Sequence, residues 1–462
     1  MNMNAPEQVI KMYAAREEIY PRETKGRYAS LRWVFVWLTQ LAFYGTPWLT
    51  WNGRQALLFD LASRKFYIFG LVLWPQDFIY LAALLIICAY LLFLATAIAG
   101  RVWCGFACPQ TVYTEIFLWI ERKFEGTRSA RMRLAKEGAT FNKAWRKGGK
   151  HLAWGAVALW TGYTFVGYFT PIKSLAHEAL TLSFGPWEWF WVLFYALATY
   201  GNAGWLREQV CKYMCPYARF QSSMFDRDTL IITYDAKRGE PRGPRGKGGK
   251  GANGSCIDCS MCVQVCPVGI DIRKGLQYEC IGCAACVDAC NSVMDKIGEP
   301  RGLVLYSTDH ALAERYTPRQ IRQHALRPRV LIYSAILLFI ICAVGTALWL
   351  RTPLKMDVIR DRGAMGREVE NGMIENVYRL QIMNTSEQAH RYRISVSGLS
   401  TLELVTDKEV ELAGTETRAV PVRLRTAHGD GAKGSNKIAF ELKALDDPAL
   451  QVRENAVFIV PR

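Results

Sequence analysis

Five apolar stretches divide this chain, and each is long enough to cross a lipid bilayer, which takes about 20 residues. None contains a charged side chain, and charged residues flank each one. One such stretch could be the core helix of a soluble protein. Five together predict an integral membrane protein that is embedded in a lipid bilayer. The predicted spans are Trp33–Gly53, Phe78–Gly100, Leu152–Ile172, Trp189–Leu206 and Val330–Leu350.

The pattern changes after Arg351, where apolar and polar residues alternate in short segments that turn-forming residues separate. Alternation with a period of two is typical of strands that bury one face. About 105 residues with this rhythm predict an immunoglobulin-like β-sandwich, with a docking or a stabilising role. The predicted strands include Val377–Met383, Arg391–Ser397, Leu402–Val405, Arg418–Arg425 and Lys437–Leu442.

Positive charge is distributed unevenly between the loops, and this sets the expected orientation. The formal net charge is +16, but Lys and Arg gather in loops between apolar spans, so we expect no nucleic-acid partner. Six lie in residues 11–32, ten in 122–150 and four in 207–227, whereas the intervening loops hold three and one. The positive-inside rule then places the N-terminus and residues 207–329 in the cytoplasm and the C-terminal domain in the periplasm of a bacterium, across its inner membrane.

Eight of the 14 cysteines form two successive runs of the form C-x2-C-x2-C-x3-C between residues 256 and 290. In this pattern three cysteines surround one [4Fe-4S] cluster and the fourth ligates the other cluster. Zinc sites usually repeat pairs of cysteines, and a disulfide framework is the other alternative. Asn291 stands where the first run has Pro267, and it removes no ligand. The predicted ligands are Cys256, Cys259, Cys262 and Cys290 for cluster 1, and Cys280, Cys283, Cys286 and Cys266 for cluster 2.

A second cysteine pattern, C-x3-C-P, occurs just after the second and the fourth predicted spans. Each proline disfavours a helix at the cysteine before it and suits the first turn of a new helix, so we expect Cys108 and Cys215 at helix N-termini. Thiolates are ligands for Cu(I), zinc and iron–sulfur centres, and Met214 is a further soft donor. Small buried packing residues are the alternative. The candidate copper ligands are Cys104, Cys108, Cys211 and Cys215.

Other candidate residues carry weaker signals. Cys88 and Cys342 lie within spans and are expected to be core residues, and His151 and His177 lie near span ends, where an interfacial role is favoured over haem ligation. The predicted domains are a cytoplasmic N-terminal segment (1–32), a four-helix membrane domain with both C-x3-C-P motifs (33–236), a flexible basic linker (237–254), a two-cluster ferredoxin domain (255–300), a cytoplasmic connector (301–329), a fifth transmembrane helix (330–350) and a periplasmic immunoglobulin-like domain (351–462).

This order of features resembles the CcoG family of cytochrome c oxidase accessory proteins, also called FixG or RdxA. The resemblance covers nearly the whole chain, and its first half also resembles the membrane polyferredoxins near NapH and NosR. The phrases that carry it are VWCGFACPQTVYTEIF at 102–117, CKYMCPYARFQSSMFD at 211–226 and ENVYRLQIMN at 375–384.

The resemblance implies a cupric reductase that supplies Cu(I) to a cbb-type haem–copper oxidase. Its implied partners are copper chaperones or transporters and oxidase assembly factors, and its implied cofactors are two [4Fe-4S] clusters, with copper as a candidate third. No flavin or nicotinamide motif identifies the electron donor. An electron relay to quinone or a partner enzyme, and a redox-sensing assembly scaffold, are the alternatives.

Overall fold

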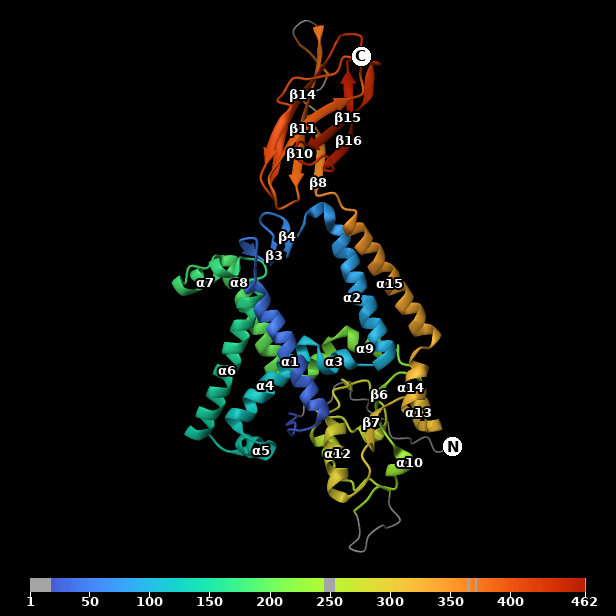
Figure 1. The fold of residues 1–462 in the computed structure, drawn as a ribbon. Coiled ribbons are helices and arrows are strands. Elements are labelled where there is room, and N and C mark those ends of the chain that lie inside the picture. The colour runs from blue at the N-terminus through green and yellow to red at the C-terminus, as the bar shows by residue number, and fades with distance from the viewer. Residues whose placement is uncertain (1–17, 245–253, 362, 364–365, 370–371, 462) are drawn as a thin grey trace, which may run out of the picture. The chain divides into compact units, whose positions relative to one another are not determined.

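The computed structural model describes residues 18–244, 254–361, 363, 366–369 and 372–461 (Figure 1). The chain divides into two compact units, and each unit is built from two separate segments. Unit 1 consists of Met1–Trp48 and Leu85–Leu338, and unit 2 consists of Leu49–Leu84 and Phe339–Arg462. The sequence did not predict that the loop after the first apolar stretch would group with the C-terminal domain.

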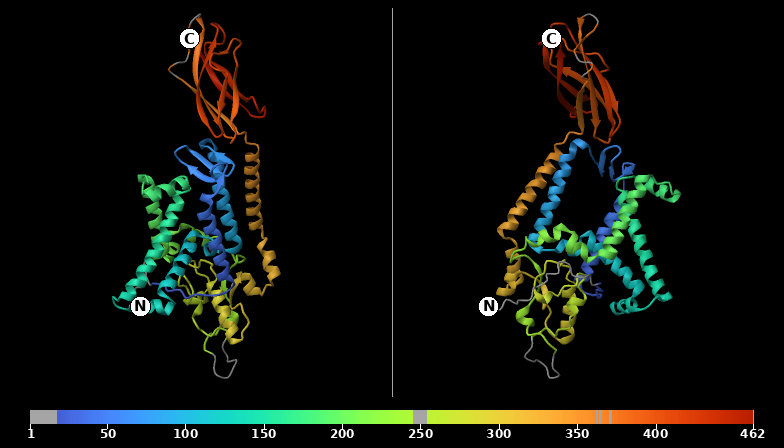
Figure 2. Two further views of the ribbon diagram at one scale, coloured as in Figure 1. Left: turned by 60° about the vertical axis from the view of Figure 1, so that its left-hand side comes forward. Right: turned by 180° about the vertical axis from the view of Figure 1, so that it is seen from behind.

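Unit 1 is mainly helical, and α4, α6 and α8 pack side by side in it (Figures 1 and 2). The helices that lie wholly within unit 1 are α1 (Arg27–Gly45), α3 (Val102–Phe106), α4 (Pro109–Glu125), α5 (Arg128–Lys136), α6 (Phe141–Val166), α7 (Ile172–Thr181), α8 (Pro186–Thr199), α9 (Pro216–Ser222), α10 (Ala236–Gly239), α11 (Met261–Gln264), α12 (Ala285–Ile297), α13 (Asp309–Glu314) and α14 (Pro318–Ala325). Helices α2 (Phe78–Ala99) and α15 (Pro328–Trp349) each begin in one unit and end in the other. Two π-helical segments, η3 (Tyr200–Leu206) and η4 (Val210–Met214), follow α8.

Two helical stretches in the described part of the chain, Pro75–Ala99 and Pro328–Trp349, are long and apolar enough to cross a membrane. The other three predicted spans coincide largely with α1, with α6 and with α8 plus η3, so five crossings stay a prediction. Cys88 on α2 and Cys342 on α15 are exposed, which corrects the expectation that they are core residues. Almost none of the most apolar part of either stretch is buried within the structure.

The two cysteine runs lie in a small module that is joined directly to the first helix. Strands β6 (Ile231–Tyr234) and β7 (Val304–Ser307) pair antiparallel on either side of the runs in sequence and close the module. The buried carboxylate of Asp288 on α12 accepts a hydrogen bond of 2.8 Å from the backbone N–H of Ala29 and another of 3.3 Å from that of Tyr28. These N–H groups have no partner within the first turn of α1, so Asp288 fixes α1 to the module.

The segment predicted as a flexible linker is partly built into this module. The N–H of Gly243 donates to the carbonyl of Cys256 at 3.1 Å, and the N–H of Ser255 donates to the carbonyl of Arg238 at 2.9 Å. Residues 237–244 are therefore held by backbone hydrogen bonds, which corrects the expectation of a free tether there. Residues 245–253 of the predicted linker lie outside the described residues.

Unit 2 contains the predicted β-sandwich. Its five-stranded sheet has the order β12-β14-β10-β8, with β9 also paired to β10, and its four-stranded sheet has the order β13-β11-β15-β16. Each of the five predicted strands overlaps an observed one. The strands are β8 (Leu354–Arg360), β9 (Arg367–Glu368), β10 (Ile374–Asn384), β11 (His390–Ser397), β12 (Glu403–Leu404), β13 (Glu409–Leu412), β14 (Thr417–Thr426), β15 (Gly434–Ala444) and β16 (Gln451–Val460).

The loop 49–84 folds into strands that pack on this sandwich. They are β1 (Thr50–Trp51), β2 (Arg54–Gln55), β3 (Leu57–Asp60), β4 (Lys65–Ile68) and β5 (Leu71–Leu73). Val72 and Trp74 form a small buried cluster with Met383 of β10. The buried carboxylate of Asp77 pairs with Arg351 at 2.7 Å and also with Lys355. These contacts explain why the loop belongs to unit 2.

Candidate metal centre

The cysteines of each predicted cluster line one cavity, and each set takes three cysteines from one run and one from the other. One cavity is lined by Cys256, Cys259, Cys262 and Cys290. A neighbouring cavity is lined by Cys266, Cys280, Cys283 and Cys286, with Cys262 in the wall between them. The fourth cysteine of each run therefore lies with the first three cysteines of the other run, as [4Fe-4S] ligation in this pattern requires.

The two runs have the same backbone conformation around their second cysteine. Asp258 and Ser260 flank Cys259 with φ values of 53° each, and Gly282 and Ala284 flank Cys283 with φ values of 69° and 57°. Left-handed residues alternating with right-handed ones turn successive backbone N–H groups toward one point, a geometry found at many iron–sulfur sites. Both quartets thus have donors suited to an anionic cluster.

Burial strongly disfavours free thiolates in these cavities. It raises the pKa of Cys262 to about 11, and those of Cys280 and Cys290 to about 12. Near pH 7 each would hold its proton unless a metal displaced it, because metal binding deprotonates a coordinating thiol outright. The donor set therefore fits two [4Fe-4S] clusters, and cluster binding releases the thiol protons.

Asn291 has a structural role of its own at the position where the first run has Pro267. Its side-chain oxygen accepts a hydrogen bond of 2.9 Å from the backbone N–H of Gly302. This bond joins α12 to the chain that leads into β7. Asn291 therefore helps to close the module, and its presence in place of proline removes no cluster ligand.

The C-x3-C-P motifs have the predicted helix boundaries. Cys108 and Cys215 are the residues that precede α4 and α9, both are extended, and the proline after each begins the helix. Cys104 lies in α3, and Cys211 lies in the π-helical segment η4. Helices of the π type are rare overall, and those that occur are often found at functional sites. No feature of the sequence indicated this geometry around Cys211.

Side-chain hydrogen bonds hold the two motifs together. The thiol of Cys104 donates to the Oε1 atom of Gln221 on α9 at 3.4 Å, and the Nε2 of Gln221 donates to the carbonyl of Gly100 at 3.0 Å. From the other side, the Nε2 of Gln110 on α4 donates to the carbonyls of Asn202 and Arg207 at 2.8 and 3.1 Å. Sequence analysis missed both glutamines, since an isolated Gln carries no recognisable pattern.

The four motif thiols are each partly buried and influence one another electrostatically. Burial raises the pKa of Cys104 to about 12, and the nearby thiols of Cys108, Cys211 and Cys215 add to this rise. Burial also raises the pKa of Cys211 to about 11, with further contributions from Cys108 and Cys215. The buried guanidinium of Arg101 acts in the opposite direction on both thiols. The two motifs therefore lie near enough for their four thiols and the guanidinium of Arg101 to affect one another's charge.

This site lies directly against the second cysteine run. A Cβ atom on Gly105, which follows Cys104, would be 2.7 Å from the carbonyl oxygen of Gly282 and 2.9 Å from the backbone nitrogen of Cys283. Cys104 and Cys211 also pack on the apolar cluster that contains Cys283, together with Cys266, Cys280 and Cys286. Only glycine at position 105 allows the two backbones to approach so closely.

No observation confirms copper at the four motif thiols. Among the described residues, no three His, Cys, Asp or Glu side chains lie close enough to hold one metal ion, and this holds for the two ferredoxin quartets as well. The copper site stays a prediction. Of the weaker candidates, His151 is held by Tyr200, whose hydroxyl lies 2.9 Å from Nδ1, and its ring stacks on Trp205.

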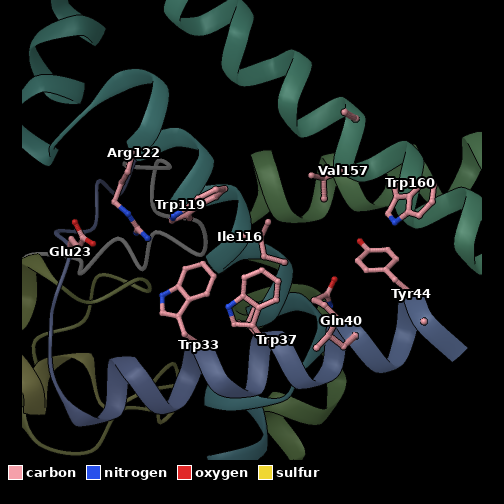
Figure 3. A pocket seen from close by; sticks show the side chains of 14 residues that line it. Glu23, Trp33, Trp37, Gln40, Tyr44, Ile116, Trp119, Arg122, Val157 and Trp160 are labelled. Carbon is pink, nitrogen blue, oxygen red and sulfur yellow. The ribbon is translucent and has the colours of Figure 1, made fainter.

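A separate cavity of about 890 Å³ lies between α1, α4 and α6. Figure 3 shows Trp33 and Trp37 rising from α1 toward Trp119 of α4, and Tyr44 facing Trp160 of α6. The other lining residues include Gln40, whose buried Oε1 has no hydrogen-bond partner among the described residues, and Glu23 and Arg122 at one end. A smaller cavity shares Glu23, Trp33 and Arg122 and reaches Pro267, next to Cys266.

Comparison with family models supports this interpretation of the cysteines. A model described as a 4Fe-4S dicluster domain matches residues 206–309, and one described as a 4Fe-4S binding domain matches residues 81–126. A third, described as the immunoglobulin-like fold at the C-terminus of FixG, matches residues 344–461. The iron–sulfur and sandwich predictions are thus confirmed at the level of the domain.

Three relatives match over most of their length. Protein RdxB of Cereibacter sphaeroides is 40% identical over 413 residues, which is 87% of each chain. Protein RdxA of the same organism is 38% identical and covers 92% of each chain. The nitrogen fixation protein FixG of Rhizobium meliloti is 37% identical and covers 84% of this chain and 80% of its own.

Proposed function

Since this chain belongs to the FixG/RdxA family of iron–sulfur proteins, we propose that it is a membrane-bound electron-transfer protein that reduces Cu(II) to Cu(I). The copper would serve the assembly of a cbb-type haem–copper cytochrome c oxidase, in contact with copper chaperones or transporters and oxidase assembly factors. The observation that carries the proposal is the direct contact between the second cysteine run and the first C-x3-C-P motif at Gly105. This contact gives electrons a short way from the ferredoxin module to thiols beside the apolar helices.

The residues around the contact keep the electron-transfer path between the two sites short. The clusters, when bound, transfer one electron at a time, which is the step that Cu(II) reduction needs. The Cys104 and Cys211 side chains pack directly on apolar residues of the module. Gln221 and Gln110 hold the motifs to each other, and Asp288 holds α1 to the module.

Copper chemistry also fits the surface near the second motif. Met214 lies between Cys211 and Cys215, and 58% of its surface is exposed. A thioether is a soft ligand that prefers Cu(I) to Cu(II), so it favours the reduced product. Copper arriving at this surface would meet a donor next to the site that supplies the electron.

The apolar helices support a place in the bacterial inner membrane. We propose five crossings, with the N-terminus and the ferredoxin module in the cytoplasm and the C-terminal domain in the periplasm, because Lys and Arg concentrate in the expected cytoplasmic loops. A reporter fused after Arg462 should be active only in the periplasm, and one fused near Gly251 only in the cytoplasm. A C-terminal reporter active in the cytoplasm would show that one span is wrongly assigned.

The test of copper reduction uses the full-length protein, purified without oxygen. Its clusters are reduced with dithionite, excess reductant is removed, and Cu(II) is added with a Cu(I)-specific chromogenic chelator. We expect one Cu(I) for each electron that the clusters lose, as followed by the return of their visible absorbance. Clusters that remain reduced in the presence of Cu(II) would refute the proposal.

The aromatic cavity favours electron exchange with a quinone as a second candidate function. Its four tryptophans and Tyr44 suit a flat ring, and Gln40 provides a buried polar atom without a partner among the described residues. Reduction would consume two electrons and two protons per quinone. A water-soluble ubiquinone or menaquinone analogue should then reoxidise the reduced protein without copper, and Gln40→Leu should slow this reaction. Reduced protein that does not respond to either analogue would exclude this function.

A further inference from the structure

Two [4Fe-4S] clusters leave five cysteines unused in the two regions that match iron–sulfur domains. Residues 206–309, matched as a dicluster domain, contain ten cysteines, and two [4Fe-4S] clusters use eight of them. Cys211 and Cys215 remain. Residues 81–126 match a 4Fe-4S binding domain but contain only Cys88, Cys104 and Cys108. A cluster in that region therefore needs cysteines from elsewhere in the chain.

We propose that Cys104, Cys108, Cys211 and Cys215 bind a third [4Fe-4S] cluster. Two contacts join the motif of one matched region to the two remaining cysteines of the other. Cys104 donates a hydrogen bond to Gln221 of α9, the helix that begins directly after Cys215, and Cys104 and Cys211 pack on the same apolar cluster. Cys88 is excluded, since it is exposed on α2, well before the motif. Four cysteines in one site are the usual ligand set of such a cluster.

The surroundings of the four thiols are those of a bound anion. A [4Fe-4S] cluster with four thiolates carries net negative charge, and a buried charge needs a partner. Arg101 is 4% exposed, and its Nε atom has no hydrogen-bond partner among the described residues. One of its terminal nitrogens donates to the carbonyl of Ala218, which fixes the guanidinium beside the thiols. The buried positive charge of Arg101 would offset the negative charge of the cluster, and its Nε–H could donate a hydrogen bond to it.

The position of the site gives the third cluster its role. Cys104 and Cys211 pack on the apolar cluster that contains Cys283, together with Cys266, Cys280 and Cys286, and these last four are the predicted ligands of cluster 2. One electron leaves reduced cluster 2, which returns to its 2+ state, and converts the third cluster from 2+ to 1+. The third cluster then gives this electron to the acceptor, Cu(II) under the proposed function. The three clusters form a chain that ends at the C-x3-C-P motifs.

This assignment competes with the predicted copper site, because both use the same four thiols. A third cluster leaves none of them free, so copper receives its electron nearby, for example at the exposed Met214. The assignment itself does not depend on copper being the acceptor. Metal content therefore tests the cluster, and Cu(I) production tests the proposed function, so the failure of one is distinguishable from the failure of the other.

The test measures iron and acid-labile sulfide in the full-length protein purified anaerobically from iron-supplied cells. We expect about twelve of each per chain in the natural protein, since each cluster contains four. Replacing Cys104, Cys108, Cys211 and Cys215 together by Ser should lower both counts to about eight. The double variant Cys88→Ser, Cys342→Ser is the matched control, because both of its cysteines lie on apolar helices away from the motifs, and it should keep about twelve.

A natural protein with about eight iron and a quadruple variant with the same count would overturn the assignment. The same holds if the quadruple variant loses one copper or zinc ion and no iron. If the quadruple variant loses all of its iron, the number of clusters in the natural protein must be measured directly. Spin integration of its electron paramagnetic resonance spectrum after full reduction should give about three unpaired spins per chain, and two would overturn the assignment.

Discussion

The close contact at Gly105 makes a sharp prediction for the variant Gly105→Ala. The added methyl carbon would lie 2.7 Å from the Gly282 oxygen, 2.8 Å from the Gly282 carbonyl carbon and 2.9 Å from the Cys283 nitrogen. Ordinary contacts between carbon atoms are about 3.5–4.0 Å long, so the contact with the Gly282 carbonyl carbon, at 2.8 Å, is too short by at least roughly 0.7 Å. All three neighbours are backbone atoms, and no side chain can rotate to make room.

The α3 segment and the ferredoxin module must therefore move apart. Overpacking of this kind costs about 1–3 kcal/mol, which would lower the midpoint of thermal unfolding. We also expect slower reoxidation of the reduced protein by Cu(II), with the iron content unchanged, because the variant widens the gap without removing a ligand. Differential scanning fluorimetry and stopped-flow absorbance would measure the two effects.

Gly155→Ala is the matched control. Gly155 lies within α6, and an added Cβ there meets nothing within 4 Å. Because alanine is favoured over glycine in helices by about 1 kcal/mol, this variant should be as stable as the natural protein or slightly more stable. If Gly105→Ala matched Gly155→Ala in both stability and reoxidation rate, the backbone contact would have no role in holding the module or in electron transfer.

Three further predictions concern charged residues. Asp77→Asn leaves the cations of Arg351 and Lys355 without their buried partner, at a cost of about 3–5 kcal/mol, so hydrogen exchange in unit 2 should become faster. Although burial raises the pKa of Glu375, hydrogen bonds from two arginines hold it below its usual value. Its contribution to stability is thus present above about pH 4.3 and lost as the pH falls further, and Glu375→Gln should remove this acid sensitivity in hydrogen exchange of the C-terminal domain. Arg101→Gln should make the potential of the proposed third cluster more negative in a redox titration followed by electron paramagnetic resonance, because the lost cation no longer stabilises the added electron; an unchanged potential would contradict its role.

Spacing, proline positions and polar–apolar alternation in the sequence predicted several features of the structure. The crossing cysteine quartets follow from the spacing of the two runs, the starts of α4 and α9 follow from Pro109 and Pro216, and the five predicted strands follow from alternation. The helix starts and the strands depend on residues within one turn or one strand of each other, and the crossing of the quartets follows from the same spacing repeated in two runs.

Features that depend on distant residues could not be predicted in this way. The packing of Trp74 on Met383 joins segments about 300 residues apart, and no local pattern marks it. The contact of Gly105 with Gly282 has the same character, since a glycine in sequence does not reveal which backbone approaches it. The π-helical turn at Cys211 was also missed, because apolar periodicity there is the same as for an ordinary helix.

The central claim is that electrons leave the ferredoxin module through the C-x3-C-P site. The most direct test compares reoxidation by Cu(II) in the natural protein and in the variant with serine at Cys104, Cys108, Cys211 and Cys215, both with their ferredoxin clusters fully loaded and reduced. We expect rapid return of the cluster absorbance in the natural protein and clusters that stay reduced in the variant. A variant that is reoxidised at the natural rate would contradict it.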